Sequence, residues 1–257
     1  MTGRLTITGG CCFDDHALVC LRQKVSLHVP GDAAGTDLPD TIPDAIKGRI
    51  RMLYPTRPPE GGTIRHFRSS RLIADCVAAA FGDAGLQAGD VEGSDTGFVS
   101  GSYYGCAEFL DTLRESLHRD GPRAIRPTDF SIATHGYPMA ALGMAYRATG
   151  PSTAFLCGPA SVTEALAFAR TMLDSGLTRR MVVVGYELLG PQTRRHHARL
   201  SSGALTETVA CLVLEGDRGQ EGVPLPRYSR TVGDPARLGA APLHALLSSL
   251  LSKMVTA

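Results

Sequence analysis

The sequence predicts an α/β protein with a five-stranded, mostly parallel sheet and helices on both faces. Three observations predict this fold. Five short apolar runs have the length and β-branched content of buried strands, segments of helical periodicity separate most of them, and Gly-Pro pairs mark several of the boundaries. Strands that alternate with helices are typical of βαβ units, whose strands lie parallel. The predicted strands are residues 4–9, 97–101, 153–157, 181–185 and 209–215.

The first third of the chain contains a strand, a long loop and a helix. Residues 4–9 alternate in polarity and end on glycine, as a half-buried strand does. Residues 30–62 are rich in Pro, Gly and Asp, which predicts an extended loop with one helix at 42–53. Apolar residues then recur three and four apart through residues 65–86, and Gly85 marks the end of that predicted helix.

Two further helices are expected before the third predicted strand. Residues 108–118 have helical periodicity and stop before Gly121-Pro122, and residues 128–147 have the same periodicity over a longer stretch.

The central feature is the stretch from Gly150 to Leu166. A short apolar strand at 153–157 lies between two Gly-Pro pairs. Pro159 suits the first position of a helix, where a missing N–H costs nothing. Residues 160–175 are small or apolar on nearly every side, which predicts a buried helix. The sequence therefore predicts a strand, a tight turn and a buried helix.

Composition excludes several classes of protein. The 257-residue chain has 43% hydrophobic residues and a formal net charge of +1, which favours neither nucleic acid nor a membrane surface as a partner. Its seven cysteines include no CxxC pair and lie mostly in apolar runs, so we expect a reducing, cytoplasmic setting. We find no signal peptide pattern, and no spacing that predicts a metal site or a cofactor. The adjacent His196 and His197 are expected in a surface loop.

The central stretch resembles the nucleophile region of the thiolase-fold β-ketoacyl synthases. Those enzymes carry a catalytic Cys in a Thr-Ala-Cys-Ala-Ser motif at the turn, and counting forward from Gly150-Pro151 places that Cys at Pro159, followed by Ala160-Ser161. The resemblance implies a chain without the nucleophile. It also implies the loss of an oxyanion-hole donor, because Pro has no N–H. The alternative is that the alignment is off by two residues and Cys157 is the nucleophile.

The resemblance covers the N-terminal half of the thiolase fold, roughly residues 3–216. We expect residues 1–216 to form this ketosynthase-like half and residues 217–257 a short extension, because the His-containing motifs of the family's second half have no match. The second half is thus expected to be missing or reduced to an amphipathic helix at 241–254. That helix has three open interpretations: a cover for the exposed layer, an ordinary core helix, or a partner-binding helix.

Among these proteins the chain most resembles the chain-length factor of type II polyketide synthases. In that subunit a helix before the Gly-Pro pair carries residues that gate the acyl tunnel, and aligning on Gly121-Pro122 places them at Ala107, Leu110 and Arg114. The small Ala107 implies a longer or wider tunnel, and Arg114 either caps its far end or points away. The alternative is a plain amphipathic helix.

The resemblance also implies a partner. In the family the strand before the nucleophile pairs across the dimer axis, which here implicates Thr153, Ala154, Phe155, Leu156, Cys157 and Gly158. The expected function is a non-catalytic subunit that heterodimerises with a complete ketosynthase and shapes the tunnel for acyl chains on an acyl carrier protein. Two alternatives stay open: a reduced condensing enzyme or acyltransferase that uses Cys157, and a scaffold module without a tunnel role.

Overall fold

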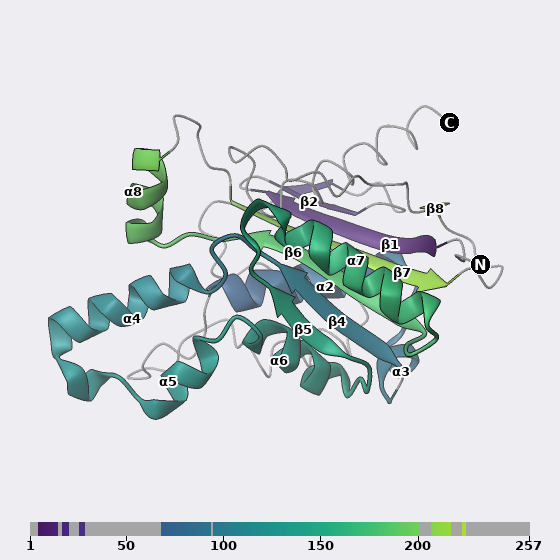
Figure 1. The fold of residues 1–257 in the computed structure, drawn as a ribbon, viewed down its shortest axis with the longest axis horizontal. Coiled ribbons are helices and arrows are strands. Elements are labelled where there is room, and N and C mark those ends of the chain that lie inside the picture. The colour runs from purple at the N-terminus through teal and green to yellow at the C-terminus, as the bar shows by residue number, and fades with distance from the viewer. Residues whose placement is uncertain are drawn as a thin grey trace.

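One mixed sheet forms the centre of the molecule (Figure 1). The computed structural model describes residues 5–14, 17–20, 26–28, 68–93, 95–200, 207–216 and 223–224. The sheet has the order β3-β2-β1-β7-β6-β4-β5, and β8 pairs with β1 off this path. Its strands are β1 (Leu5–Asp14), β2 (Ala17–Cys20), β3 (Ser26–His28), β4 (Thr96–Gly101), β5 (Ser152–Phe155), β6 (Arg180–Glu187), β7 (Thr208–Gly216) and β8 (Val223–Pro224).

The five predicted strands are the core of this sheet, and their directions confirm the expected fold class. β4 lies parallel to both β5 and β6, while β7 is antiparallel to β6 on one side and to β1 on the other. Four of the five core strands, β1, β4, β5 and β6, therefore run in the same direction. The short strands β2, β3 and β8, which the sequence did not predict, extend the sheet beyond β1 by antiparallel pairing.

Helices cover both faces of the sheet. α2 and α6 contact one face, and α7 contacts the other through β4, β5, β6 and β7. α4, α5 and α8 lie beyond the end of the sheet, at the left of Figure 1. The helices are α2 (Arg68–Asp83), α3 (Ala88–Val91), α4 (Ala107–Asp120), α5 (Pro127–Ile132), α6 (Tyr137–Tyr146), α7 (Ser161–Asp174) and α8 (Pro191–Leu200).

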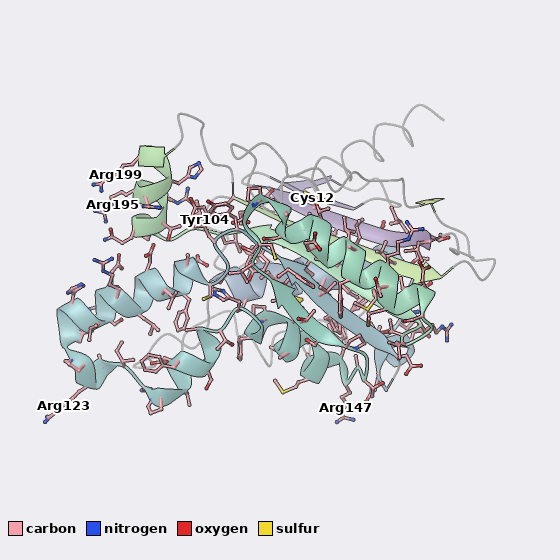
Figure 2. All side chains as sticks on the ribbon, viewed as in Figure 1. Cys12, Tyr104, Arg123, Arg147, Arg195 and Arg199 are labelled. Atoms are coloured by element: carbon pink, nitrogen blue, oxygen red, sulfur yellow. The ribbon has the colours of Figure 1, made fainter. Side chains whose placement is uncertain are left out.

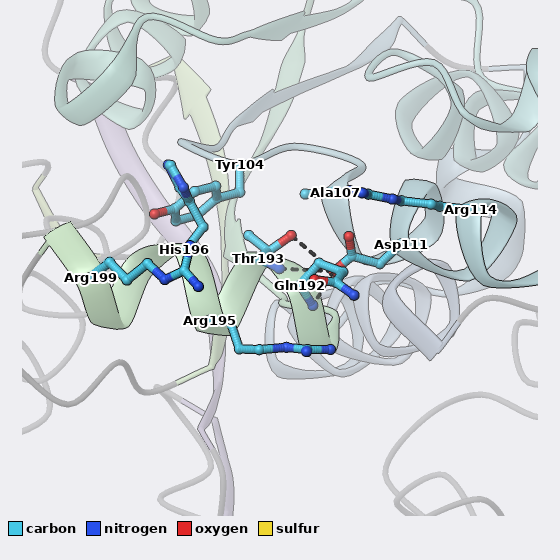
Figure 3. A pocket seen from close by; sticks show the side chains of 9 residues that line it. All are labelled: Tyr104, Ala107, Asp111, Arg114, Gln192, Thr193, Arg195, His196 and Arg199. Carbon is cyan, nitrogen blue, oxygen red and sulfur yellow. Dashed lines mark hydrogen bonds between the residues drawn. The ribbon is translucent and has the colours of Figure 1, made fainter. Parts of the chain in front are cut away.

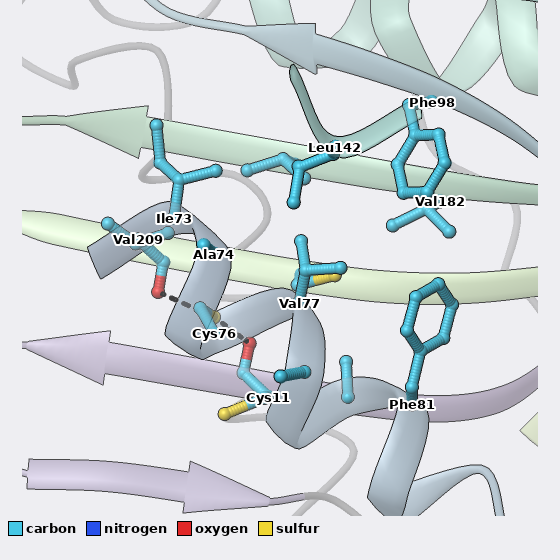
Figure 4. Packing of buried hydrophobic residues seen from close by; sticks show 14 of the residues in the cluster. Cys11, Ile73, Ala74, Cys76, Val77, Phe81, Phe98, Leu142, Val182 and Val209 are labelled. Carbon is cyan, nitrogen blue, oxygen red and sulfur yellow. Dashed lines mark hydrogen bonds between the residues drawn. The ribbon is translucent and has the colours of Figure 1, made fainter. Parts of the chain in front are cut away.

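The larger core cluster lies between α2, α6 and the sheet (Figure 4). Phe81 of α2, Phe98 of β4 and Tyr146 of α6 form an aromatic group, with ring centroids 4.9 to 6.3 Å apart. Such edge and stacked pairs add about 0.5–1.5 kcal/mol each to the free energy of their burial. Three elements distant in sequence are thereby held together on this face.

Several element boundaries differ from the prediction. β1 continues to Asp14, well past Gly9. The single helical stretch predicted at 128–147 is two helices, because Gly136 and Pro138 stand at the start of α6. α7 is not buried all round: its sheet-facing residues are buried, while Thr171 and Asp174 are exposed in this chain.

Some predictions fall outside the described residues. They are the helix at 42–53 and the C-terminal helix at 241–254. The domain boundary after residue 216 coincides with the end of β7 and stays a prediction.

Candidate functional site

The turn between β5 and α7 is built around Ser161. The chain leaves β5, passes through a 3-10 turn at Gly158–Ala160, and enters α7 at Ser161. The Ser161 Oγ accepts a hydrogen bond from the Cys157 N–H at 2.9 Å and donates one to the Gly158 carbonyl at 2.6 Å. Gly158 has φ of 62°, a conformation that favours glycine. These contacts produce the sharp strand-to-helix turn that the sequence predicts.

The turn lies close against the end of β4. A Cβ atom added to Gly101, the last residue of β4, would come within 2.5 Å of the Ser161 backbone. Only glycine therefore permits this approach. The start of α7 and the adjoining turn consequently lie at the carboxyl ends of the parallel strands, where α/β proteins place their sites.

Pro159 lies within this turn and offers neither a thiol nor an N–H. The other candidate, Cys157, is exposed and precedes the turn, with φ of −110° and ψ of 31°. Among the described residues its hydrogen bond is made by its backbone N–H to Ser161, and none joins it to a histidine. The turn thus joins a strand to a helix as a nucleophile turn does, and in the described residues no histidine is hydrogen-bonded to Cys157.

β5 is an edge of the described sheet, because it pairs with β4 alone. Ser152 is exposed, the rest of the strand is half-buried, and Leu156 beyond it is 38% exposed. The expected pairing segment of residues 153–158 is a strand only as far as Phe155, since Cys157 and Gly158 already belong to the turn. Its role as an interface stays a prediction, but an edge is free to pair.

The three residues predicted to gate a tunnel lie on α4, as expected, but they do not share one environment. Ala107 is half-buried, and it lines a cleft together with the exposed Arg114. Leu110 is 48% exposed and is not among the residues that line this cleft. The residue that completes the cleft-facing side of α4 is Asp111, four residues after Ala107 and three before Arg114.

The cleft lies between α4 and α8 and has a volume of about 630 Å³ (Figure 3). α8 contributes residues at positions i, i+3, i+4 and i+7, namely Gln192, Arg195, His196 and Arg199, and Thr193 and Tyr104 complete the lining. A cleft of this size is in the range of small-molecule sites. Its lining is polar and rich in arginine, whereas an acyl tunnel is expected to be apolar.

Asp111 joins the two walls of the cleft. Its Oδ2 accepts hydrogen bonds from the N–H groups of Gln192 and Thr193, both at 2.9 Å, and from the Thr193 hydroxyl at 3.1 Å. These N–H groups belong to the first turn of α8, which has no helical partners for them. The carboxylate therefore caps α8 from another helix and faces the positive end of its dipole.

The histidine pair lies in α8, so the expected surface loop is wrong. His196 is exposed and lines the cleft, while the adjacent His197 is buried, with 7% exposed, and does not line it. The His197 Nδ1 lies 3.1 Å from the Tyr104 hydroxyl. Burial, followed by the nearby Tyr103 and Glu187, raises the pKa of Tyr104, so its hydroxyl stays neutral at physiological pH.

The loop before α4 is held to the sheet by Glu187, the last residue of β6. Its carboxylate accepts hydrogen bonds from the N–H groups of Tyr103 and Tyr104.

The thiol of Cys106, directly before α4, donates a hydrogen bond to the Ala133 carbonyl at 2.7 Å. Burial raises the pKa of Cys106 more than its backbone hydrogen bond lowers it, so this thiol is not an activated nucleophile.

Sequence reasoning missed Asp111 and the arginines of α8. A signal was present: residues 194–199 contain Arg, Arg, His, His and Arg, and α8 has no acidic residue.

No group of three or more metal-ligating side chains occurs in the described part of the chain. No helix there is long and apolar enough to span a membrane. Figure 2 shows Arg195, Arg199 and Tyr104 at the end of the molecule occupied by α8.

Comparison with solved structures shows the same architecture. The chain is similar to a type II polyketide synthase acyl-carrier protein–ketosynthase complex, AntDE:AntF (TM-score 0.58, 17% identity, 85% of this chain, 64% of that chain). It is similar to the ketosynthase ApeO in complex with its chain length factor ApeC from Xenorhabdus doucetiae (TM-score 0.58, 18% identity, 96% of this chain, 92% of that chain). It also resembles the ishigamide ketosynthase/chain length factor (TM-score 0.58, 18% identity, 87% of this chain, 65% of that chain).

At 17–18% identity these likenesses show the fold alone, and the chain spans less than two thirds of the length of two of these structures. No curated protein sequence matches the chain significantly. The family assignment rests on a match that covers more than half of the chain. The model of the β-ketoacyl synthase N-terminal domain matches residues 65–217, and the chain therefore belongs to the β-ketoacyl synthase family.

Proposed function

We propose that this protein is a non-catalytic, chain-length-factor-like subunit. It pairs with a complete ketosynthase and shapes the acyl tunnel while that enzyme elongates polyketide or fatty-acyl chains. The acyl chains reach the complex on an acyl carrier protein. Support comes from the family, from the similar complexes that contain a chain length factor or an acyl-carrier protein, and from the geometry of the nucleophile turn.

Pro159 is the observation that carries the proposal. The chain retains the strand, the tight turn and the helix that present a nucleophile in its family, yet the turn residue is a proline. A covalent acyl intermediate needs a nucleophile, and an oxyanion hole needs N–H donors. Pro159 supplies neither a nucleophile nor an N–H donor. We therefore propose that the fold is retained for another purpose, which is pairing with an active ketosynthase of the same fold.

Exposed apolar side chains support a partner surface. α4 and α5 project from the sheet (Figure 1), and they expose Leu117 (43%), Leu110 (48%) and Phe130 (66%). These residues and the β5 edge together offer apolar contacts and unpaired backbone groups. Permanent protein interfaces are apolar and commonly bury roughly 2,000–5,000 Å². The exposed position of Leu110, one of the predicted gate residues, agrees with a tunnel formed against a second subunit.

An enzyme that uses Cys157 is the second candidate, favoured by the exposure of that thiol. We expect an acyl-pantetheine with a thiol-reactive chloroacryl group to label the ketosynthase and not Cys157, because the described residues place no base on Cys157. Intact-mass analysis of the co-purified complex measures both chains. Iodoacetamide provides the accessibility control, and Cys157→Ser is expected to leave turnover unchanged. Acyl labelling of Cys157 as fast as that of the ketosynthase would exclude the non-catalytic assignment.

A further inference from the structure

The α4–α8 cleft is cationic at the place where an acyl tunnel is expected to be apolar. Ala107 and Arg114, two of the predicted gate residues, line it from α4, and Arg195, His196 and Arg199 line it from α8 (Figure 3). The whole chain has a net charge of only +1. Three guanidinium groups around one cleft are therefore a local concentration of charge.

The three arginines of the cleft differ from most other arginines in the described residues, which form salt bridges. Those that do are Arg119, Arg147, Arg170, Arg180 and Arg194. Within the described ranges, Arg114, Arg195 and Arg199 have no carboxylate within salt-bridge distance. Arg195 makes one weak hydrogen bond, from its Nε to the Pro191 carbonyl at 3.3 Å. The guanidinium donors in the cleft are thus available to a ligand.

The carboxylate of Asp111 does not neutralise the cleft. Its Oδ2 is engaged by the first turn of α8. Even when the full negative charge of Asp111 is counted, the cleft is lined by three guanidinium groups and one carboxylate. The cleft therefore keeps a net positive charge.

α8 is also locally unfavourable as a helix. Arg195 and Arg199 are a like-charge pair at i and i+4, which destabilises a helix by about 0.2–0.5 kcal/mol. Arg194 is paired with Glu207, and Asp111 caps the first turn, but Arg195 and Arg199 have no carboxylate partner in the described residues. Local departures of this kind tend to mark functional positions. An anion bound in the cleft compensates the charge of these two arginines.

We infer that the α4–α8 cleft binds the distal end of the acyl chain, and that this end carries an anionic group, a carboxylate or a phenolate. The inference rests on the proposed function, because it takes the cleft as part of the acyl tunnel. Guanidinium groups suit such a group through paired N–H donors. The Gln192 amide adds a neutral donor beside them, and the Tyr104 hydroxyl, which lies 3.1 Å from the His197 Nδ1, borders the same cleft. The small Ala107 leaves room for the chain between the two helices.

A methyl-ended chain gains nothing from these donors and would remove their water without replacing it. The cleft therefore selects among acyl chains by their ends as well as by their lengths. Arg114, Arg195 and Arg199 are the residues assigned to this selection.

The test compares two probes of equal chain length, monomethyl sebacate and methyl decanoate. Both have a methyl ester at one end, which stands in for the thioester, but only monomethyl sebacate has a carboxylate at the other end. Calorimetry on the full chain, and on its complex with the ketosynthase, measures both affinities. We expect monomethyl sebacate to bind at least tenfold more tightly. Each of Arg114→Gln, Arg195→Gln and Arg199→Gln should weaken it about three- to tenfold in dissociation constant. Arg119→Gln is the matched control. Arg119 lies on α4, as Arg114 does, but it is paired with Asp120, so this substitution should leave the affinity for monomethyl sebacate unchanged.

Three results would overturn the inference. The first is equal affinity for the two probes. The second is an unchanged affinity for monomethyl sebacate in the triple arginine variant, with an intact fold by circular dichroism. The third is inorganic phosphate binding as tightly as monomethyl sebacate, because the cleft would then hold an ion and not a chain end. Any of these results, together with a complex that forms and whose tunnel variants alter product length, rejects this inference alone. A complex that never forms rejects the proposed function instead.

Discussion

Ala107→Phe is expected to shorten the products of the ketosynthase complex by one or more elongation steps. Ala107 is half-buried and lines the cleft from the first turn of α4. A phenyl ring there projects into the space that a growing chain occupies, and a blocked chain is released or stalls at a shorter length. Liquid chromatography with mass spectrometry of the products, made with the purified complex and acyl carrier protein, measures the length distribution.

Leu110→Phe separates two versions of this prediction. If the described cleft is the relevant part of the tunnel, Leu110→Phe has a smaller effect than Ala107→Phe, because Leu110 does not line the cleft. If the tunnel lies instead between α4 and the partner, the exposed Leu110 has the larger effect. An unchanged product distribution with normal turnover in both variants would favour a scaffold module without a tunnel role.

Glu215→Ala is expected to lower the free energy of unfolding by about 3–5 kcal/mol, the usual cost of leaving a buried charge without its partner. Glu215 on β7 faces Arg180 on β6, and the Arg180 Nε lies 2.5 Å from the Glu215 Oε1. Both side chains are about 5% exposed. Among the described residues, Arg180 keeps long hydrogen bonds to the Asp90 carbonyl and the Thr96 hydroxyl, at 3.2 and 3.3 Å.

Urea unfolding followed by circular dichroism measures this loss. The control is Asp120→Ala, which removes an exposed pair with Arg119 and should leave the midpoint unchanged. Equal midpoints for Glu215→Ala and the wild type would show that the β6–β7 pairing does not depend on this ion pair.

The strands could be predicted because their burial leaves a local signal. Residues 181–185 and 209–214 are continuous apolar runs, and β6 and β7 are buried along almost their whole length. The β5–α7 turn could be predicted because Gly158 permits the positive φ that the turn requires and Pro159 fixes φ at the next residue. β2, β3 and β8 were missed because strands of two to four residues are fixed by pairing with a neighbouring strand, β1 for β2 and β8 and β2 for β3, and not by their own composition.

The cleft could not be predicted because it depends on a contact between helices about 80 residues apart. Periodicity placed Ala107, Leu110 and Arg114 on one side of α4, but it could not show that Asp111 turns toward α8. The same limit explains the error at His196 and His197. A run of charged residues is common in loops, and only the Tyr104–His197 contact and the Asp111 cap show why this one is a helix.

The central claim, that this protein is a partner subunit, is tested most directly by native mass spectrometry after co-expression with a ketosynthase from the same biosynthetic gene set. The account predicts a stable one-to-one heterodimer, held through the β5 edge and the exposed side chains of α4 and α5. It also predicts aggregation of the chain expressed alone, because that edge and those side chains are then uncovered. A well-behaved monomer or homodimer that ignores the ketosynthase would contradict the claim.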